Sequence, residues 1–143
     1  MRHPNFHWAD HWLEQASVVA KASKDPSTQV GAILVDDMNR VVSQGYNGFA
    51  RGCSDDPRIY QDRDRKLMRV LHAEENAILF AERKAYTAYV THPPCAHCTA
   101  LLIQSGIKRI VYKDAPLRDS WKASIEEAKS MCAEAGVIYG PRD

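Results

Sequence analysis

Two short stretches of the chain carry residues that can bind a metal ion. His72 and Glu74 open "HAEENAI", and Cys95 and Cys98 lie in "HPPCAHC". Cysteines spaced i, i+3 share one face of a helix, and a helix N-terminus favours their thiolate form. Two thiolates leave a tetrahedral zinc ion two ligands short, and His72 is the natural third. Three protein ligands with an open fourth position describe a catalytic zinc site.

Glu74 has a predicted role in acid–base catalysis. Near a helix start, the Glu74 side chain can face the same ion as His72. It would lie beside the open coordination position of the ion without being a ligand. Zinc lowers the pKa of water from about 15.7 towards about 7, so a carboxylate there can pass a proton from water to a substrate nitrogen. The alternatives are a capping or surface histidine, a redox Cys-x-x-Cys pair or a structural zinc site. Pro94 and Glu74 favour catalysis, because H-x-E followed by P-C-x-x-C is a general signature of zinc nucleobase deaminases.

The apolar pattern predicts the elements that must position these residues. Expected helices cover residues 10–23, 67–84, 95–106 and 121–136, a hairpin covers 29–48, and strands cover 85–90, 107–112 and 137–140. Residues 49–66 mix charge signs with Gly and Pro and predict a long loop with room for a short helix. Alternation of helix and strand predicts an α/β fold with helices on both faces of the sheet.

Length and composition narrow the function classes. The 143 residues, 45% hydrophobic and 26% charged, predict one domain over 1–143 with its own core. A net charge of +1 disfavours nucleic acid and anionic membranes as partners. The chain shows neither an apolar run of membrane length nor a signal-peptide core, which predicts a cytoplasmic protein, or one in the host cytoplasm if viral. In that compartment the four cysteines are expected to be reduced.

The chain resembles the deoxycytidylate (dCMP) deaminase family through "SKDPSTQVGAILV", "GYNGFARGCSDD", "HAEENAI" and "HPPCAHCTALLIQSGIKRIVY". The resemblance implies a three-layer α/β/α cytidine-deaminase-like fold, with a mixed sheet of about five strands and an N-terminal hairpin. It implies hydrolysis of dCMP to dUMP and ammonia, with Glu74 carrying protons to N3 and then to the leaving amine. His72, Cys95 and Cys98 match the ligands of one catalytic zinc ion per chain.

The same resemblance suggests residues that bind the substrate. Asn47 matches an asparagine that contacts the sugar, although Asn-Gly is also a common turn. Candidate phosphate donors are Ser23, Lys24 and Arg118, and the two cations could equally be solvated surface charges. Trp121 could stack on the pyrimidine or belong to the core.

The family is often regulated, and the resemblance extends to its regulatory segment. It implies activation by dCTP and inhibition by dTTP in a homohexamer. The candidate effector residues, with Mg²⁺ as an accompanying ion, are Arg51, Gly52, Cys53, Asp55 and Asp56; a polar, well-turned loop is the alternative. Rival functions are a tRNA adenosine deaminase, which the near-neutral charge disfavours, and a non-catalytic nucleotide-sensing zinc protein, which would not need Glu74.

Overall fold

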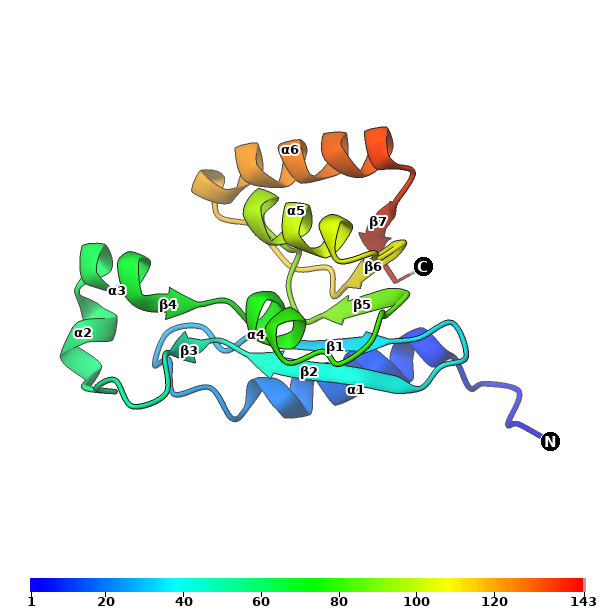
Figure 1. The fold of residues 1–143 in the computed structure, drawn as a ribbon, viewed down its shortest axis with the longest axis horizontal. Coiled ribbons are helices and arrows are strands. Elements are labelled where there is room, and N and C mark those ends of the chain that lie inside the picture. Colours follow the sequence, from blue (N-terminus) through cyan, green and yellow to red (C-terminus); the bar gives the residue numbers. More distant parts are fainter. Residues whose placement is uncertain (143) are drawn as a thin grey trace.

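A mixed five-stranded sheet lies at the centre of the structure, a computed structural model that describes residues 1–142 (Figure 1). Residue 143, the last of the predicted domain 1–143, lies outside the described residues. The strand order is β2-β1-β5-β6-β7. The strands are β1 (Gly31–Val35), β2 (Val41–Tyr46), β5 (Thr87–Val90), β6 (Arg109–Tyr112) and β7 (Ile138–Pro141). β1 is antiparallel to β2 and β5, whereas β5, β6 and β7 are parallel, which confirms the predicted hairpin and mixed sheet.

Helices cover both faces of this sheet, as predicted. α1 (Trp8–Ala20) packs on one face, where Ile33 and Val35 of β1 meet Trp12 and Leu13. The opposite face, with Leu34 of β1, packs against α4 (Ala73–Leu79), α5 (Ala96–Gln104) and α6 (Asp119–Ala135). Successive residues of a strand point to opposite faces. A fully buried β1 therefore serves both cores and forms the middle of three layers.

The predicted continuous helix over 67–84 is wrong. Instead α3 (Arg63–Arg69) ends, β4 (Val70–Leu71) pairs with β3 (Gly48–Phe49), and α4 begins after His72. Val70 already has extended backbone angles, φ −73° and ψ 134°. The Glu75 carboxylate accepts the His72 N–H at 2.8 Å and completes a capping box, which starts a new helix at this point. A two-residue interruption leaves the apolar pattern nearly intact, so periodicity alone does not reveal it.

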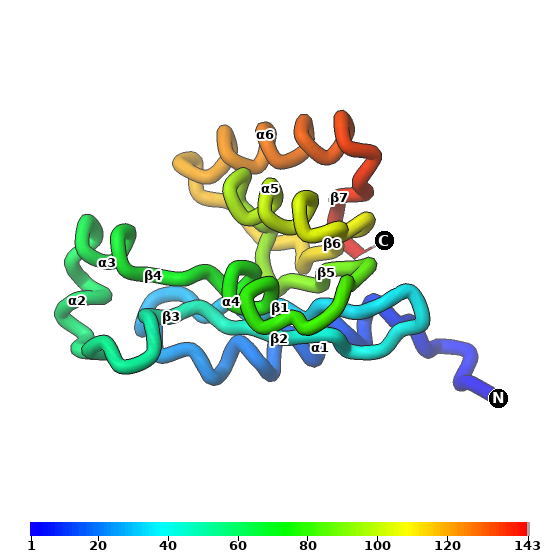
Figure 2. Tube along the Cα trace, viewed as in Figure 1, coloured from blue at the N-terminus to red at the C-terminus, as the bar shows by residue number. Residues whose placement is uncertain are grey.

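The predicted loop over 49–66 contains more regular structure than expected. It holds β3, α2 (Pro57–Gln61) and the start of α3. Asp56 and Asp62 cap these two helices by accepting the N–H groups of Arg58 and Arg65. Figure 2 shows this part, in green, extending beyond one end of the sheet. Among residues 1–142, no helix has the length and apolar character that a membrane span requires.

Gly31 is required where α1 crosses β1, and its replacement gives a first prediction. A Cβ atom at Gly31 would lie 2.0 Å from the Ala16 carbonyl oxygen and 2.7 Å from the Ala20 nitrogen. Gly31→Ala is expected to lower the free energy of unfolding by about 1–3 kcal/mol, because the backbone of α1 must move away. Urea denaturation measures this loss. Gly140→Ala is the control, since nothing lies within 4 Å of its added Cβ; equal stability of both variants would contradict the packing described.

Candidate metal centre and active site

Three donor atoms converge where α4 and α5 begin. His72 is the N-cap of α4, Cys95 is the N-cap of α5, and Cys98 lies in the first turn of α5. Their donor atoms all lie within 4.8 Å of one another. His72 Nδ1 is 3.2 Å from Cys98 Sγ and 3.7 Å from Cys95 Sγ. Zinc bonds of about 2.0 Å to nitrogen and 2.3 Å to sulfur at tetrahedral angles place N and S about 3.5 Å apart, so this cluster fits zinc.

Hydrogen bonds also couple the protonation of the three donor side chains. Hydrogen bonds from Cys98 and His72 hold the pKa of the Cys95 thiol well below its usual range. The hydrogen bond to Cys95, followed by burial, raises the pKa of Cys98, and the same thiolate raises the pKa of His72 to about 8. Protons are therefore shared between the three side chains. A divalent cation that binds here would displace these protons, because metal ligands bind in their deprotonated forms. The Cys98 backbone N–H, 3.4 Å from Cys95 Sγ, adds the N-terminal dipole of α5.

Glu74 lies in the first turn of α4, with only 4% of its surface exposed. Burial raises the pKa of Glu74 to about 7, and interactions with His72 and Cys98 offset part of that rise. A carboxyl group with a pKa near neutrality can both accept and return a proton, as general acid–base catalysis requires. The interruption between α3 and α4 places His72 and Glu74 together at a helix start.

The β3–β4 pairing places Asn47 beside the metal ligands, a feature that the sequence analysis missed. Gly48 pairs with Leu71, so the preceding Asn47 and the following His72 lie next to each other across the two strands. The Asn47 side chain is buried and orients the loop before β1. Its Oδ1 accepts the Val30 N–H at 2.8 Å, and its Nδ2 donates to the Thr28 carbonyl at 2.9 Å.

The two other candidates from "SKDP" differ in their surroundings. Ser23 is buried, and its hydroxyl donates to the Asn47 carbonyl at 2.8 Å. Lys24 is exposed, and its Nζ lies 2.6 Å from Asp55 Oδ2. This ion pair joins a candidate phosphate donor to the candidate effector segment, a link that the sequence did not indicate.

The candidate effector residues occupy an exposed turn between β3 and α2. Gly52 has a φ of 89°, which glycine adopts readily, and the Cys53 N–H donates to the Ala50 carbonyl at 3.0 Å. Arg51 and Cys53 are exposed. Asp56 has a structural role as the N-cap of α2, so the turn alternative also has support.

Arg118 and Trp121 lie at the start of α6, close to the start of α5. Arg118 is the exposed N-cap of α6, and Trp121 is 40% exposed and therefore not a core residue. The Ser124 hydroxyl accepts the Ala96 N–H at 2.8 Å, which fixes the N-terminal part of α6 beside the start of α5. Both candidates thus lie on the side of the molecule that carries the metal ligands.

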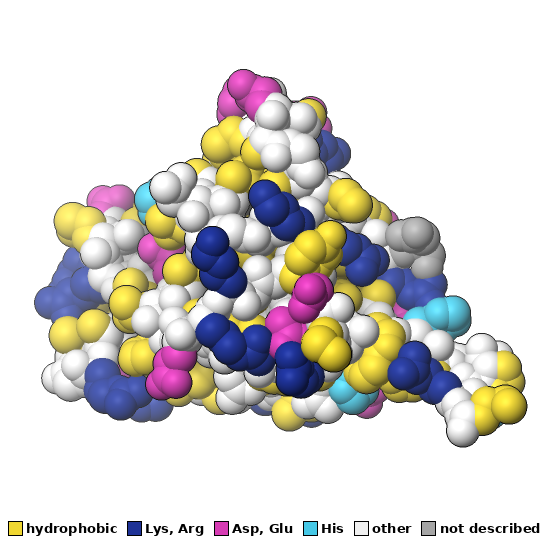
Figure 3. Space-filling model, turned by 45° about the vertical axis from the view of Figure 1, so that its right-hand side comes forward, with side chains coloured by type: hydrophobic (Ala, Val, Ile, Leu, Met, Phe, Trp, Pro, Cys, Tyr) yellow, Lys and Arg dark blue, Asp and Glu magenta, His cyan; other side chains and the backbone are white. Residues whose placement is uncertain are grey.

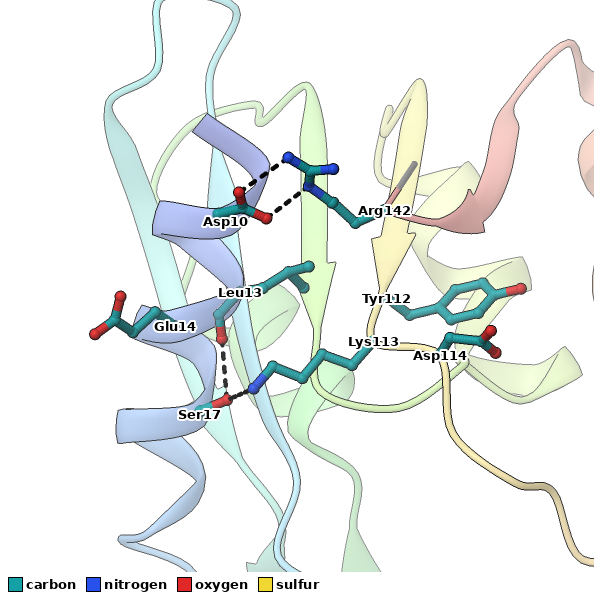
Figure 4. A pocket seen from close by; sticks show the side chains of 8 residues that line it. All are labelled: Asp10, Leu13, Glu14, Ser17, Tyr112, Lys113, Asp114 and Arg142. Carbon is teal, nitrogen blue, oxygen red and sulfur yellow. Dashed lines mark hydrogen bonds and ion pairs between the residues drawn. The ribbon is translucent and has the colours of Figure 1, made fainter. Parts of the chain in front are cut away.

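A separate cavity of about 430 Å³ lies between α1 and the end of β6 (Figure 4). Arg142 forms an ion pair with Asp10 across it, with Nε and Oδ1 2.6 Å apart, and Lys113 contacts the Ser17 hydroxyl. Because these polar groups are paired with one another, the cavity shows no convergence of catalytic side chains comparable with the metal cluster.

Comparisons with known proteins agree with the geometry. The family model described as the cytidine and deoxycytidylate deaminase zinc-binding region matches residues 6–114. An uncharacterised deaminase of Aliivibrio fischeri is 43% identical over 135 residues, covering 91% of this chain and 90% of the relative. The deoxycytidylate deaminase of Mus musculus is 38% identical over 140 residues, covering 92% and 78%. The crystal structure of dCMP deaminase from cyanophage S-TIM5, in complex with dCMP and dUMP, covers 99% of this chain and 100% of that one. It shares the fold at a TM-score of 0.71 and 21% identity.

Proposed function

The chain belongs to the cytidine and deoxycytidylate deaminase family, and from this premise we propose that it hydrolyses dCMP to dUMP and ammonia. The observation that carries the proposal is the cluster of His72, Cys95 and Cys98 donor atoms, together with the buried Glu74 carboxyl that interacts with Cys98 and His72. The chain's similarity to deoxycytidylate deaminases over most of its length supports the choice of substrate.

His72, Cys95 and Cys98 would hold zinc, which when bound acts as a Lewis acid and lowers the pKa of water from about 15.7 towards about 7. Glu74 accepts a proton from the water molecule while the water oxygen adds to C4 of cytosine. Glu74 transfers that proton to N3 of the ring. Glu74 then carries the proton of the new hydroxyl group to the amino group. The C4–N bond breaks, C4–O becomes a carbonyl, and ammonia leaves with dUMP.

The side chains around this centre suggest how the nucleotide is held. Asn47, adjacent to His72, is proposed to contact the deoxyribose, and the exposed Trp121 ring is proposed to cover the pyrimidine. Lys24 and Arg118 supply positive charge for the 5′-phosphate, since both are exposed and chemically suited to it. The Ser23 hydroxyl is already bonded to the Asn47 backbone, so it contributes mainly by holding Asn47.

A phosphate contact predicts a loss that depends on the substrate. Arg118→Met is expected to lower kcat/KM for dCMP by about tenfold or more, because a hydrogen bond between charged groups is removed. Deoxycytidine has no phosphate, so its kcat/KM should remain unchanged. Steady-state kinetics of both substrates measures the difference, with Lys24→Met as a parallel variant. An equal loss of kcat/KM on both substrates would contradict a role of the substituted residue in phosphate binding.

The proposal extends to regulation by nucleoside triphosphates and to assembly of the chain. We propose activation by dCTP and inhibition by dTTP, with Mg²⁺, at the segment from Arg51 to Asp56 in a cytoplasmic homohexamer. The exposed Arg51 and the Lys24–Asp55 ion pair, which joins this segment to a candidate phosphate donor, support a regulatory role. Activity assays with each triphosphate and light scattering test these two points.

A comparison of substrates tests the proposed function against the rival functions. A tRNA adenosine deaminase needs a basic surface for RNA. The net charge is +1, and on the face in Figure 3 basic and acidic side chains are interspersed. Ammonia release should be fastest with dCMP among dCMP, CMP, deoxycytidine, dCTP and tRNA. Preferential deamination of tRNA would instead identify a tRNA adenosine deaminase. Zinc binding without turnover of any substrate would favour the non-catalytic nucleotide sensor.

A further inference from the structure

An ion pair with a buried carboxylate joins α3 to the loop that precedes β1. Lys66 Nζ lies 2.7 Å from Asp25 Oδ2, and the two side chains are only 22% and 2% exposed. Burial alone would raise the pKa of Asp25, but hydrogen bonds from Lys66 and two backbone N–H groups lower it below the usual value. The ammonium also lies 5.9 Å from the centre of the Tyr60 ring, which stacks on Phe49 of β3. Removing one partner would leave the other charge buried without compensation.

The Asp25 carboxylate organises the loop that contacts Asn47. Oδ1 accepts the N–H groups of Ser27 at 2.8 Å and Thr28 at 3.2 Å. Oδ2, which binds Lys66, also lies 3.4 Å from Asn47 Nδ2. One carboxylate therefore connects an α3 cation, a backbone turn and the amide of Asn47.

The far end of this chain of contacts lies at the metal centre, because β3 and β4 place Asn47 beside His72. We propose that Lys66 is a positioning residue for the deamination: through Asp25 it fixes the Asn47 amide where the sugar of the nucleotide binds. This inference rests on the proposed function, in which Asn47 contacts the deoxyribose. Lys66 touches no reacting atom, and its contribution is to neutralise a carboxylate that otherwise draws water into the loop.

Two substitutions of Lys66, one that removes its charge and one that keeps it, test this route from Lys66 to Asn47. Lys66→Met is expected to raise KM for dCMP by about tenfold, the loss for one misplaced substrate hydrogen bond, while kcat and zinc content change little. Lys66→Arg should keep KM near the wild-type value, because it retains a cation that can pair with the Asp25 carboxylate. Lys129→Met is the control, since its pair with Glu126 is exposed on α6.

Hydrogen exchange supplies a readout that is independent of activity. The Val30 N–H is bonded to Asn47 Oδ1, so its protection should fall in Lys66→Met and remain at the wild-type level in Lys66→Arg. A wild-type protein inert on dCMP would refute the proposed function, whereas Val30 exchange would still decide the structural route. A folded Lys66→Met protein with unchanged KM and unchanged Val30 protection overturns the inference. If Lys66→Met does not fold, Asp25→Asn decides, because its amide nitrogen would face the Lys66 and Asn47 donors in place of Oδ2. A raised KM then supports the inference, and a wild-type KM overturns it.

Discussion

Replacing Glu74 by glutamine is expected to lower kcat for dCMP by about 10²- to 10⁴-fold, the usual contribution of a general acid–base residue. Glutamine has nearly the same shape, but it neither accepts the proton from water nor returns it to N3 and the leaving amine. Glu74 is not one of the three clustered donor residues, so bound zinc should remain at the wild-type level. Single-turnover assays of ammonia release, with zinc measured on the same sample, test both statements.

The neighbouring Glu75 provides a matched control for this substitution. Its Oε1 accepts the His72 N–H at 2.8 Å in the capping box, and glutamine can accept the same hydrogen bond. Glu75→Gln should therefore keep kcat within a small factor of the wild-type value. Equal losses in the two variants would mean that charge at the α4 N-terminus matters, rather than proton transfer at Glu74.

The second large effect is expected at His72, whose replacement by alanine should remove both zinc and activity. Two cysteines alone leave the ion with half of a tetrahedral set, so affinity should fall and zinc should be lost on dialysis. Zinc content, measured by atomic absorption after dialysis, should fall from about one ion per chain to near zero.

His97 is the control for the metal site because it lies between Cys95 and Cys98 but is exposed. Its side chain is 73% exposed, and its nearest acidic partner is Glu75 at 3.9 Å. His97→Ala should therefore retain the zinc content of the wild-type protein. Retention of stoichiometric zinc by His72→Ala, or its loss from His97→Ala, would contradict the assigned ligand set.

The cluster of His72, Cys95 and Cys98 could be predicted from the sequence because the chemistry of such a site is tied to residue spacing. Cys95 and Cys98 are i, i+3 at a helix start, and His72 with Glu74 completes a set that few other functions use. The helical layers on both faces of the sheet followed from the alternation of apolar segments, whereas the mixed sheet was implied by the resemblance to the dCMP deaminase family. These features depend on local residue patterns, which a single sequence displays.

The surroundings of the metal ligands depend on contacts between distant segments, and these could not be predicted. The break at Val70 comes from pairing with β3, a tertiary contact that overrides an unbroken helical pattern. The Lys66–Asp25 pair was missed for the same reason, since neither residue differs in sequence from an ordinary surface charge. Lys24 and Asp55 were assigned to separate sites, yet they form one ion pair.

The most direct test of the central claim is a zinc titration of the chelator-stripped protein with dCMP as substrate. Formation of dUMP and ammonia in equal amounts should rise with added zinc and reach a plateau at about one ion per chain. Full activity of the zinc-free protein would contradict a metal-dependent mechanism. A protein that binds one zinc ion per chain yet releases no ammonia from dCMP would contradict the assigned reaction.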